Sequence, residues 1–442
     1  MGRAAARTLV AWLDELGRIS DEPDGLTRTF LSPAMRRANA QVARWMTAAG
    51  LAVREDPMGN LIGRLEGPTP EAKTLWLGSH LDTVRRAGRF DGALGVLTPI
   101  AALAELRRRR VALPFAVEVL GFSEEEGVRF ASGYLGSKAF TGQLCAADLA
   151  LRDADGVTVR EAAARWNGLS PGRFAPERER VSAPTKQPGD SLRHLNSRSL
   201  DPSKLLGYVE VHIEQGPVLE RERLAVGVVS AIAGQTRGRI VFSGQAGHAG
   251  TTPMALRRDA LTGAAEFIRF VESTARLRTP LVATVGSLTV APGAPNVIPG
   301  EVKLSLDVRH PRDAARRSAL THLLAEARAI ARRRGLKFTW EKTQDDGAVA
   351  CDPGLSSRLE ASVQAVQSRS IALVSGAGHD AVVFSEVAPV AMLFVRCRAG
   401  LSHHPDEYAA PADVGVALDV LLDFLMRLNQ PSAASPQRRS SR

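Results

Sequence analysis

The sequence contains few cysteines and no long hydrophobic run. Its three cysteines are odd in number and far apart along 442 residues, which argues against a disulfide framework. We therefore expect Cys145, Cys351 and Cys397 to be small buried hydrophobic residues. No apolar run reaches the roughly 18 residues that a transmembrane helix requires, and residues 1–17 lack the continuous apolar core of a signal peptide. These absences exclude a disulfide-rich secreted domain and a membrane-spanning protein, and they favour a cytoplasmic protein.

Acidic residues are outnumbered by basic ones, 47 Asp and Glu against 57 Lys and Arg, so the formal net charge is +10. Such an excess is one sign of nucleic-acid binding. However, the basic residues are spread along the chain. Three arginines lie in residues 432–442, which we expect to form a disordered basic tail, and four lie at 107–110, where a helix is expected to end and cations suit its dipole. Because RNP, zinc-finger and basic-zipper motifs are also missing, we expect neither a nucleic-acid nor a membrane partner.

The length of the chain exceeds one comfortable hydrophobic core, so two domains are expected. The first part alternates short apolar strands with helices, and a strand–helix–strand unit implies parallel pairing and an α/β fold. Residues 167–206 are rich in Pro, Ser, Arg and Asp with little periodicity, which predicts a long surface insertion. The expected strands are 74–78, 115–122, 208–213 and 390–395, and the expected helices are 33–49, 94–106 and a closing helix that ends near 428.

A second pattern begins near residue 235 and has the order strand–helix–strand–strand–helix–strand, which is that of the ferredoxin-like βαββαβ fold. We expect this α+β domain at 235–347, inserted into a larger mixed-sheet α/β domain made of 1–234 and 348–431. Its expected strands are 238–243, 281–290, 301–309 and 337–342, and its expected helices are 257–277 and 313–334.

Side chains that can bind a metal follow the ends of the expected strands. Open α/β sheets bind ligands in the crevice at the carboxyl ends of their strands, and zinc and similar ions take imidazole nitrogen and carboxylate oxygen. A single histidine in such a place is more often structural, and three consecutive glutamates fit either a metal pair or a solvated acidic turn. Together, however, the clusters predict a metal centre. The candidates are His80, Asp82, Asp91, Glu124, Glu125, Glu126, His212, Glu214, His403 and His404.

Several short segments resemble the dinuclear-metal amidohydrolases of the M20 peptidase superfamily. More narrowly, they resemble the branch of allantoate amidohydrolases, N-carbamoyl-L-amino-acid hydrolases and β-ureidopropionases, and the segments HIEQG and SGAGHDA favour this branch over the M20 carboxypeptidases. The resemblance covers nearly the whole chain except the insertion and the tail. It is carried by GSHLDTV, GRFDGALGV, EEEGVRF, HIEQGPVLE, GQAGHAGTTPM, APNVIPG, LDVRH, SGAGHDA and GLSHHPDEY.

The resemblance implies two divalent metal ions per subunit, zinc or manganese, with cobalt or nickel also compatible with such ligands. Asp91 would bridge the ions and Asp82 would orient His80. Glu125 would be the general base that takes a proton from the attacking water, whereas Glu124 would be exposed or would cap a turn. Of the two adjacent histidines the first would be the ligand and His404 a neighbour. The implied metal ligands are His80, Asp91, Glu126, His212 and His403.

The resemblance also implies substrate-binding roles. His248, in a glycine-rich loop, would stabilise the developing oxyanion and would often reach the site of a partner subunit. Asn296 would hydrogen-bond the substrate, and the planar fork of Arg309 would clamp a carboxylate. Without the resemblance these would be read as a turn histidine, a loop asparagine and a surface arginine. Gln215 and His379 would line the pocket.

The predicted function is metal-dependent hydrolysis of a ureido C–N bond in a small substrate that also carries a carboxylate, with release of ammonia and carbon dioxide. Allantoate is the preferred substrate. The alternatives are an N-carbamoyl-L-amino-acid hydrolase or β-ureidopropionase, an M20 aminoacylase or carboxypeptidase, and a basic binding protein on an inactive hydrolase scaffold. The last would have lost a ligand or the base, and all are present. Because the predicted site residues are split across two domains, we expect the inserted domain to close over the substrate as a lid, with hinges near 233–235 and 345–347. By resemblance the same domain also forms a homodimer.

Overall fold

The computed structural model describes residues 3–169 and 201–429, and these residues fall into two compact units. The predicted tail and most of the predicted insertion lie outside the described residues. No helix in the described ranges is both long and apolar enough to cross a membrane. The first unit consists of Met1–Ser230, Cys351–Leu373 and His379–Arg442, and the second consists of Ala231–Ala350 and Val374–Gly378.

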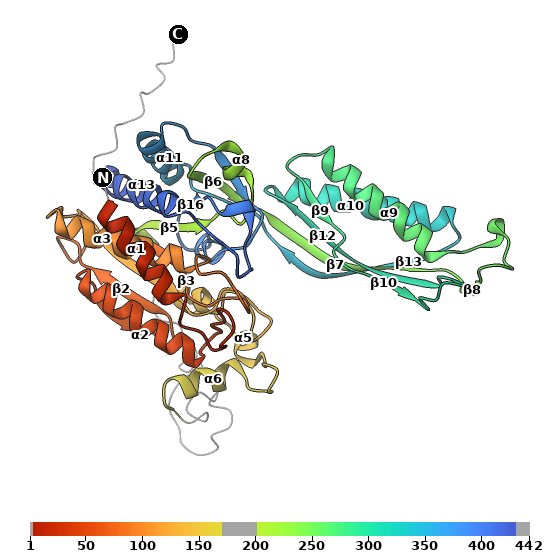
Figure 1. The fold of residues 1–442 in the computed structure, drawn as a ribbon, viewed down its shortest axis with the longest axis horizontal. Coiled ribbons are helices and arrows are strands. Elements are labelled where there is room, and N and C mark those ends of the chain that lie inside the picture. The colour runs from red at the N-terminus through yellow and green to blue at the C-terminus, as the bar shows by residue number, and fades with distance from the viewer. Residues whose placement is uncertain (1–2, 170–200, 430–442) are drawn as a thin grey trace, which may run out of the picture. The chain divides into compact units, whose positions relative to one another are not determined.

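The first unit is built on a mixed β-sheet (Figure 1). Its strands are β1 (Ala52–Glu55), β2 (Leu61–Leu65), β3 (Thr74–His80), β4 (Ala116–Phe122), β5 (Leu205–Ile213), β6 (Val226–Ile232), β15 (Ala372–Ser375) and β16 (Val390–Val395). The order is β1-β2-β4-β3-β5-β16-β6, and β15 also pairs with β6. β3 is parallel to β4 and β5, and β16 is parallel to β5, whereas β1 with β2, β2 with β4 and β6 with β16 are antiparallel.

The central strands are buried along almost their whole length because both faces of the sheet are covered. Every residue of β3, β4 and β16 is buried, as is typical of parallel strands between helices. The four strands predicted for this part are confirmed. However, β5 begins at Leu205, and a 3₁₀ turn at Pro202–Lys204 precedes it. The end predicted for the insertion, residue 206, therefore overlaps the start of β5.

Helices cover the sheet of the first unit. α3 is buried almost throughout and contacts α1, α13, β3 and β5. An aromatic cluster of Trp76, Phe122, Phe140, Tyr208 and Phe384 connects α4 and α12 to the strands. The helices are α1 (Arg3–Leu16), α2 (Pro33–Ala48), α3 (Ala93–Arg108), α4 (Leu135–Thr141), α5 (Ala146–Ala150), α6 (Val159–Trp166), α8 (Val218–Glu222), α11 (Pro353–Gln367), α12 (Ala381–Phe384) and α13 (Pro411–Leu428).

The second unit is an antiparallel sheet with two helices on one face. Its main elements are β7 (Gly234–Ser243), α9 (Ala260–Arg276), β9 (Val282–Thr284), β10 (Leu288–Ala291), β12 (Glu301–His310), α10 (Asp313–Arg333) and β13 (Lys337–Asp346). The strand order is β10-β12-β7-β13, and β9 also pairs with β12. Alternate residues of β12 are buried, because α9 and α10 pack on one side of the strands only. Shorter pieces are β8 (Gly247–His248), β11 (Val297–Ile298), β14 (Val349–Ala350) and the 3₁₀ turn Met254–Leu256.

The single strand predicted at 281–290 is wrong, since the structure has two short strands, β9 and β10, in its place. The hydroxyl oxygen of Ser305 accepts hydrogen bonds from the backbone N–H groups of Gly286 and Ser287. A side chain therefore replaces the regular strand-to-strand bonds between the two pieces. Gln235 lies in one predicted hinge and Asp346 in the other. The two residues are directly opposite each other in the antiparallel pair of β7 and β13.

The cysteines are all free thiols. Cys351 and Cys397 are buried, as predicted, but Cys145 is exposed. It precedes α5, where its backbone N–H donates to the carboxylate of Asp148. The prediction for Cys145 is therefore wrong, because its position before a helix outweighs its apolar character.

Candidate metal and catalytic site

The first unit brings a set of histidines and carboxylates together at the carboxyl ends of its parallel strands. His80 is the last residue of β3, His212 lies one residue before the end of β5, and the Glu124–Glu126 segment follows β4. Asp91 lies in the loop before α3, and His403 lies in the loop between β16 and α13. This is the edge at which open α/β sheets bind their ligands.

Asp91 lies at the centre of the cluster. Its Oδ1 is 3.4 Å from His80 Nε2 and 3.1 Å from His212 Nε2. Its Oδ2 is 3.4 Å from His403 Nε2, which is also 3.6 Å from Glu126 Oε2. Two groups suited to a metal ion, His80–Asp91–His212 and Asp91–Glu126–His403, therefore share this one carboxylate.

Hydrogen bonds on the opposite side of two imidazole rings define which nitrogen can bind a metal. His80 Nδ1 lies 3.0 Å from the carbonyl oxygen of Asp82, and His212 Nδ1 lies 3.0 Å from the carbonyl oxygen of Ile213. A carbonyl can only accept, so each Nδ1 carries the proton in the neutral ring. The Nε2 lone pairs then point toward Asp91, as in histidines that bind metals.

The donor set fits divalent metal ions. Asp91 Oδ1 and Glu126 Oε1 are buried and accept no hydrogen bond from any described residue. A buried carboxylate oxygen without a partner carries a large desolvation cost, and a cation would remove it. Mixed imidazole and carboxylate ligands suit zinc, manganese and their neighbours. The residues that would hold such ions are His80, Asp91, Glu126, His212 and His403.

The three glutamates Glu124–Glu126 form the loop after β4, called the acidic loop below. Too few positive charges lie beside them to balance their own. Burial raises the pKa of Glu125 well above its usual range, and the charge of Glu126 adds to this effect although His80 opposes it. Burial and the charge of Asp91 raise the pKa of Glu126 to about 7. Glu124 is fully buried, and its pKa is likewise raised by burial and by the charge of Asp82. The expectation that Glu124 is exposed is therefore wrong, although it does accept the N–H of Gly127.

The metal-free protein is expected to lose stability as the pH rises from about 4.5 to about 8. A group whose pKa is higher in the folded than in the unfolded state stabilises the fold below its unfolded pKa, and this contribution disappears as the pH rises through the folded pKa. Glu126 and Glu407, both with a pKa raised to about 7, lie in this window. Thermal unfolding of chelator-stripped and metal-loaded protein across this range checks the prediction. A melting temperature of the stripped protein that rises with pH would contradict it.

Asp82 holds the acidic loop as well as His80. Its carboxylate accepts the backbone N–H groups of Glu125 and Glu126, at 3.0 and 3.1 Å. His80 Nδ1 is 3.5 Å from this carboxylate but only 3.0 Å from the Asp82 carbonyl oxygen. The Asp82 side chain therefore fixes the backbone that carries the predicted base, and its main chain orients the histidine.

Two residues without a predicted role position Asp91. Glu407 Oε1 accepts the backbone N–H groups of Phe90 and Asp91, and Ser402 Oγ donates to Asp91 Oδ2 at 2.7 Å and to Glu407 at 3.1 Å. Gln215 Nε2 also donates to Asp91 Oδ2, at 3.0 Å. Ser402 and Gln215 thus hold the Oδ2 side of the carboxylate in place by hydrogen bonds, whereas Oδ1 accepts none from the described residues. Glu407 and Ser402 lie in the GLSHHPDEY segment, and that segment was the available signal.

Glu407→Ala is expected to weaken metal binding by about 10–100-fold, as loss of a group that orients a metal ligand does. Glu407→Gln keeps an oxygen that can accept the N–H groups of Phe90 and Asp91, so it is expected to restore most of the affinity. Metal titration of the stripped variants with a competing chelator measures both effects. Equal affinity of Glu407→Ala and the unaltered protein would contradict a positioning role.

Backbone conformation at the site is also specialised. Gln215 and His403 have positive φ angles of 54° and 55°, a region that costs non-glycine residues energy and is concentrated at functional sites. Gly92 has a φ of 65°, and a Cβ at this position would lie 2.4 Å from the His80 ring. Only glycine therefore lets the loop of Asp91 approach His80 this closely. Both adjacent histidines are half-exposed, but His403 joins the cluster, whereas His404 accepts the N–H of Asp406.

A second layer of buried groups lies beside His212. The ring of His379 is 4.5 Å from that of His212 and is buried, and burial together with the charge of His212 lowers the pKa of His379 well below its usual range. Glu210 accepts hydrogen bonds from Ser79 Oγ and from the backbone N–H of Ala381. His379 is therefore a neutral group that can donate or accept one hydrogen bond next to the metal ligands.

The second unit places two of the predicted substrate-binding residues next to each other. β8 and β11 pair His248 with Val297, and the N–H of Ala249 donates to the carbonyl of Asn296. His248 Nδ1 accepts the N–H groups of Gly250 and Thr251. The neutral ring then carries its proton on Nε2, and because the side chain is exposed this N–H is available to a ligand.

Arg309 is engaged within the second unit. Its fork donates to both oxygens of Asp307, from Nε at 2.9 Å and from Nη2 at 2.8 Å, and Nη1 donates to the carbonyl of Gly376 at 2.5 Å. To clamp a substrate carboxylate in the predicted way, the guanidinium would have to exchange Asp307 for the substrate.

The fold and the site together define a metal-dependent hydrolase: a buried carboxylate shared by two histidine-containing groups, with further carboxylates beside it. Comparisons with known proteins agree with this class. A family model described as peptidase family M20/M25/M40 matches residues 76–427. The chain therefore belongs to this family, and its relatives place it in the branch of allantoate and N-carbamoyl-amino-acid amidohydrolases.

The similarity extends over almost the whole chain. The chain is 40% identical to the allantoate deiminase of Arabidopsis thaliana, over 94% of this chain and 81% of that protein. It is 36% identical to the N-carbamoyl-L-amino-acid amidohydrolase of Pseudomonas sp. (strain NS671), over 95% of this chain and 97% of that protein. The crystal structure of an amidase of the hydantoinase/carbamoylase family from Burkholderia multivorans matches with a TM-score of 0.86 at 33% identity, over 96% of this chain and 98% of that one.

Proposed function

We propose that this protein is an allantoate amidohydrolase, a hydrolase of a non-peptide C–N bond. The observation that carries the proposal is the 40% identity to an allantoate deiminase over 94% of the chain, combined with a site in which no predicted ligand is substituted. Water attacks the ureido carbonyl, the C–N bond to the terminal nitrogen breaks and ammonia leaves. The carbamate that remains on the other nitrogen then loses carbon dioxide.

Glu125 is the proposed proton carrier. Its raised pKa makes its carboxylate a stronger base than a solvated glutamate, which suits transfer near neutral pH. It takes a proton from the attacking water and returns it to the departing nitrogen. Divalent ions, when bound by His80, Asp91, Glu126, His212 and His403, would polarise the carbonyl and acidify the water. The proposed number is two ions, zinc or manganese.

The proposed substrate contacts come from side chains that can donate or accept hydrogen bonds. His248 offers its Nε2 proton to the oxyanion that develops on the carbonyl, and Asn296 offers an amide. His379 offers a neutral imidazole beside the metal ligands. Arg309 binds the substrate carboxylate in place of Asp307, because the guanidinium fork matches either carboxylate equally. Gln215 keeps its bond to Asp91, beside the metal ligands.

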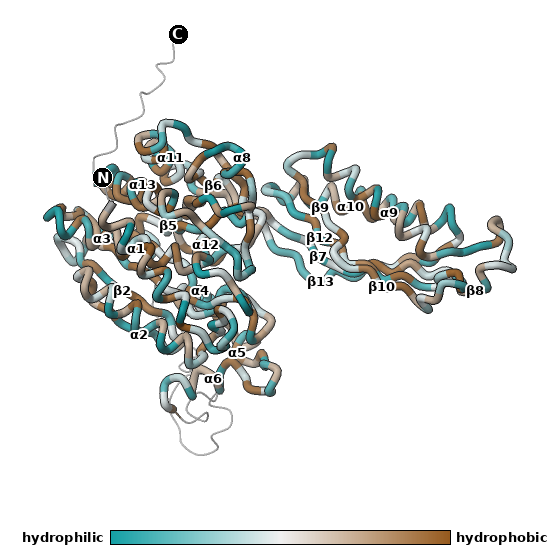
Figure 2. Tube along the Cα trace, viewed as in Figure 1, coloured by the Kyte–Doolittle hydropathy of each residue, from teal (hydrophilic) through white to brown (hydrophobic). Residues whose placement is uncertain are grey.

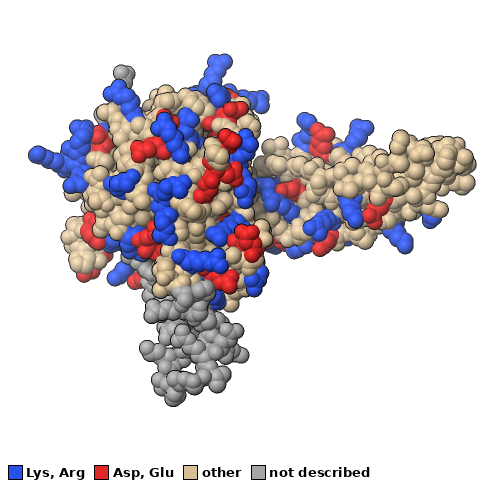
Figure 3. Space-filling model, turned by 60° about the horizontal axis from the view of Figure 1, so that its bottom comes forward, with Lys and Arg blue, Asp and Glu red and all other residues tan. Residues whose placement is uncertain are grey.

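The same second unit carries the proposed homodimer contact. Leu277, Val282 and Leu288 expose between 43% and 86% of their surface, and β10, hydrophobic in Figure 2, is an edge strand in the described sheet. Exposed apolar residues on an unpaired edge mark association surfaces. A nucleic-acid partner is not proposed: on the face in Figure 3 the Lys and Arg side chains of the first unit are interspersed with Asp and Glu.

The test is ammonia release from allantoate and from a panel of N-carbamoyl-L-amino acids. The protein is stripped with a chelator and then supplied with manganese or zinc. Metal-dependent turnover of allantoate alone supports the proposal. Turnover confined to N-carbamoyl-L-amino acids keeps the reaction but replaces the substrate, in line with the 36% identity to an amidohydrolase of that group. Cleavage of N-acyl amino acids or dipeptides, without ammonia from any ureide, overturns the proposal.

A further inference from the structure

A pocket of about 450 Å³ lies in the first unit among α2, α6 and the loop after β4. Four arginines line it, Arg36, Arg37, Arg129 and Arg165, and no acidic residue does. None of the proposed metal ligands or substrate-binding residues is part of its lining. The chemistry described above therefore leaves this concentration of positive charge unexplained.

The floor of the pocket is apolar and buried. Leu31, Ala162 and Trp166 are each less than 10% exposed. The guanidinium of Arg36 stacks 3.8 Å over the Trp166 ring and donates to the Trp166 carbonyl at 2.6 Å. Charges that sit above an apolar floor are screened less by water than charges on an open surface, so they attract an anion more strongly.

Most of this charge is not neutralised by the protein. Arg129 forms an ion pair with Asp153 at 3.0 Å and also donates to the Phe30 carbonyl. By contrast, Arg36, Arg37 and Arg165 form no ion pair with any carboxylate of the described residues, and Arg37 donates only to a backbone carbonyl, that of Ser20. The backbone N–H groups at the start of α2 are not available, since Asp21 and Ser32 already accept from Ala34 and Met35.

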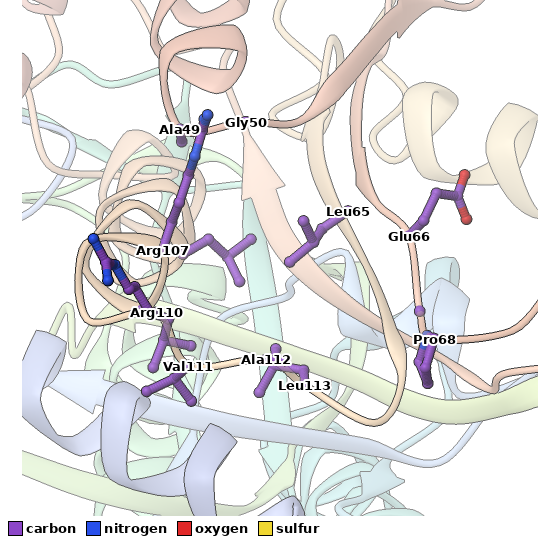
Figure 4. A pocket seen from close by; sticks show the side chains of 13 residues that line it. Ala49, Gly50, Leu65, Glu66, Pro68, Arg107, Arg110, Val111, Ala112 and Leu113 are labelled. Atoms are coloured by element: carbon purple, nitrogen blue, oxygen red, sulfur yellow. The ribbon is translucent and has the colours of Figure 1, made fainter.

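A second pocket provides a comparison. It has a volume of about 560 Å³ and is lined by apolar residues, with Arg107 and Arg110 beside them and Glu66 at its edge (Figure 4). Its arginines lie at the end of α3, where the helix dipole accounts for cations. The positive charge of this second pocket is therefore smaller and already explained.

We propose that the four-arginine pocket binds a small organic anion that carries a phosphate and a second acidic group. Guanidinium forks bind phosphate and carboxylate oxygens in pairs, which favours arginine over lysine for this task. The guanidinium groups come from α2, α6 and the loop after β4. A ligand with two anionic groups can contact all three segments at once better than a ligand with one. The volume is at the lower end of the range of small-molecule sites, which suits a compact ligand.

The test uses the full-length, metal-loaded protein and 3-phosphoglycerate as the probe, titrated calorimetrically at constant ionic strength. The variant Arg37→Gln/Arg165→Gln is expected to bind the probe at least ~10-fold more weakly, because two charge-assisted contacts are lost. The matched control is Arg107→Gln/Arg110→Gln, which removes the same charge from the other pocket and is expected to bind as the unaltered protein does. Arg129 is kept, because it fixes the loop that follows Glu125 and Glu126.

Four outcomes would overturn the proposal. Equal weakening in both double variants would show a general charge effect, and loss of binding on chelation would place the probe at the metal site. Inorganic phosphate that binds as tightly as the probe would remove the need for a second acidic group. A short DNA duplex that binds more tightly, and whose binding is lost in Arg37→Gln/Arg165→Gln, would make the partner a nucleic acid. Unchanged thermal unfolding of the variants excludes misfolding as the cause, and none of these readouts depends on turnover of allantoate.

Discussion

Glu125→Gln is expected to lower kcat for the ureide substrate by about 10³-fold while the protein keeps its fold and its metal content. Removal of a general base typically costs between 10² and 10⁴ in rate. Glutamine has the same shape but cannot accept a proton, and its backbone N–H can still donate to Asp82. KM is expected to change little, because the lost interaction acts in the transition state. Steady-state kinetics with manganese-loaded protein measures the effect.

The matched control for this prediction is Glu124→Gln, in the same loop. Burial and the charge of Asp82 raise the pKa of Glu124 well above its usual range, which favours the neutral form of its side chain. An amide is then a near-isosteric replacement that can still accept the N–H of Gly127. We expect kcat to stay within about threefold of the unaltered enzyme, since the amide keeps the hydrogen bond and replaces a carboxyl group whose neutral form is favoured. Equal losses in the two variants would remove Glu125 from the role of base.

Asp91→Asn is expected to lower kcat/KM by at least ~10³-fold together with the amount of bound metal, since stabilisation by a metal ion is worth several kcal/mol. The carboxylate serves both candidate metal groups, so a single change affects both. The amide nitrogen has no lone pair for a metal, and it would place a donor against Ser402, Gln215 or the histidines. Elemental analysis of the purified protein and steady-state kinetics measure the two losses.

Asp24→Asn, on the exposed surface of the same unit, is the control for the change of Asp91 and is expected to alter neither quantity. Excess manganese is expected to restore part of the activity of Glu407→Ala but not of Asp91→Asn. The first variant loses the orientation of a ligand and the second loses the ligand itself. Full metal content in Asp91→Asn would contradict the shared-carboxylate arrangement.

Much of the fold follows from local patterns. Apolar strands followed by polar residues were sufficient to find β3, β4, β5 and β16 within a few residues, and helical periodicity located α9 and α10. The prediction failed where a side chain overrides the backbone pattern. Ser305 interrupts the strand that is split into β9 and β10, and this contact joins residues 18 or 19 positions apart. Periodicity in a local window cannot detect such a partner.

The sequence by itself determined which residues can bind a metal, because imidazoles and carboxylates follow the ends of apolar strands and match the motifs of a known family. Only the tertiary structure decided that Asp91 joins the two groups and that Glu407, more than 300 positions away, holds the backbone of Asp91. It also decided that Arg309 donates hydrogen bonds to Asp307 and that four arginines from distant segments line one pocket. The physical reason is that a residue's type sets its chemistry, whereas the packing of parallel strands and their loops sets the distances on which coordination and electrostatics depend.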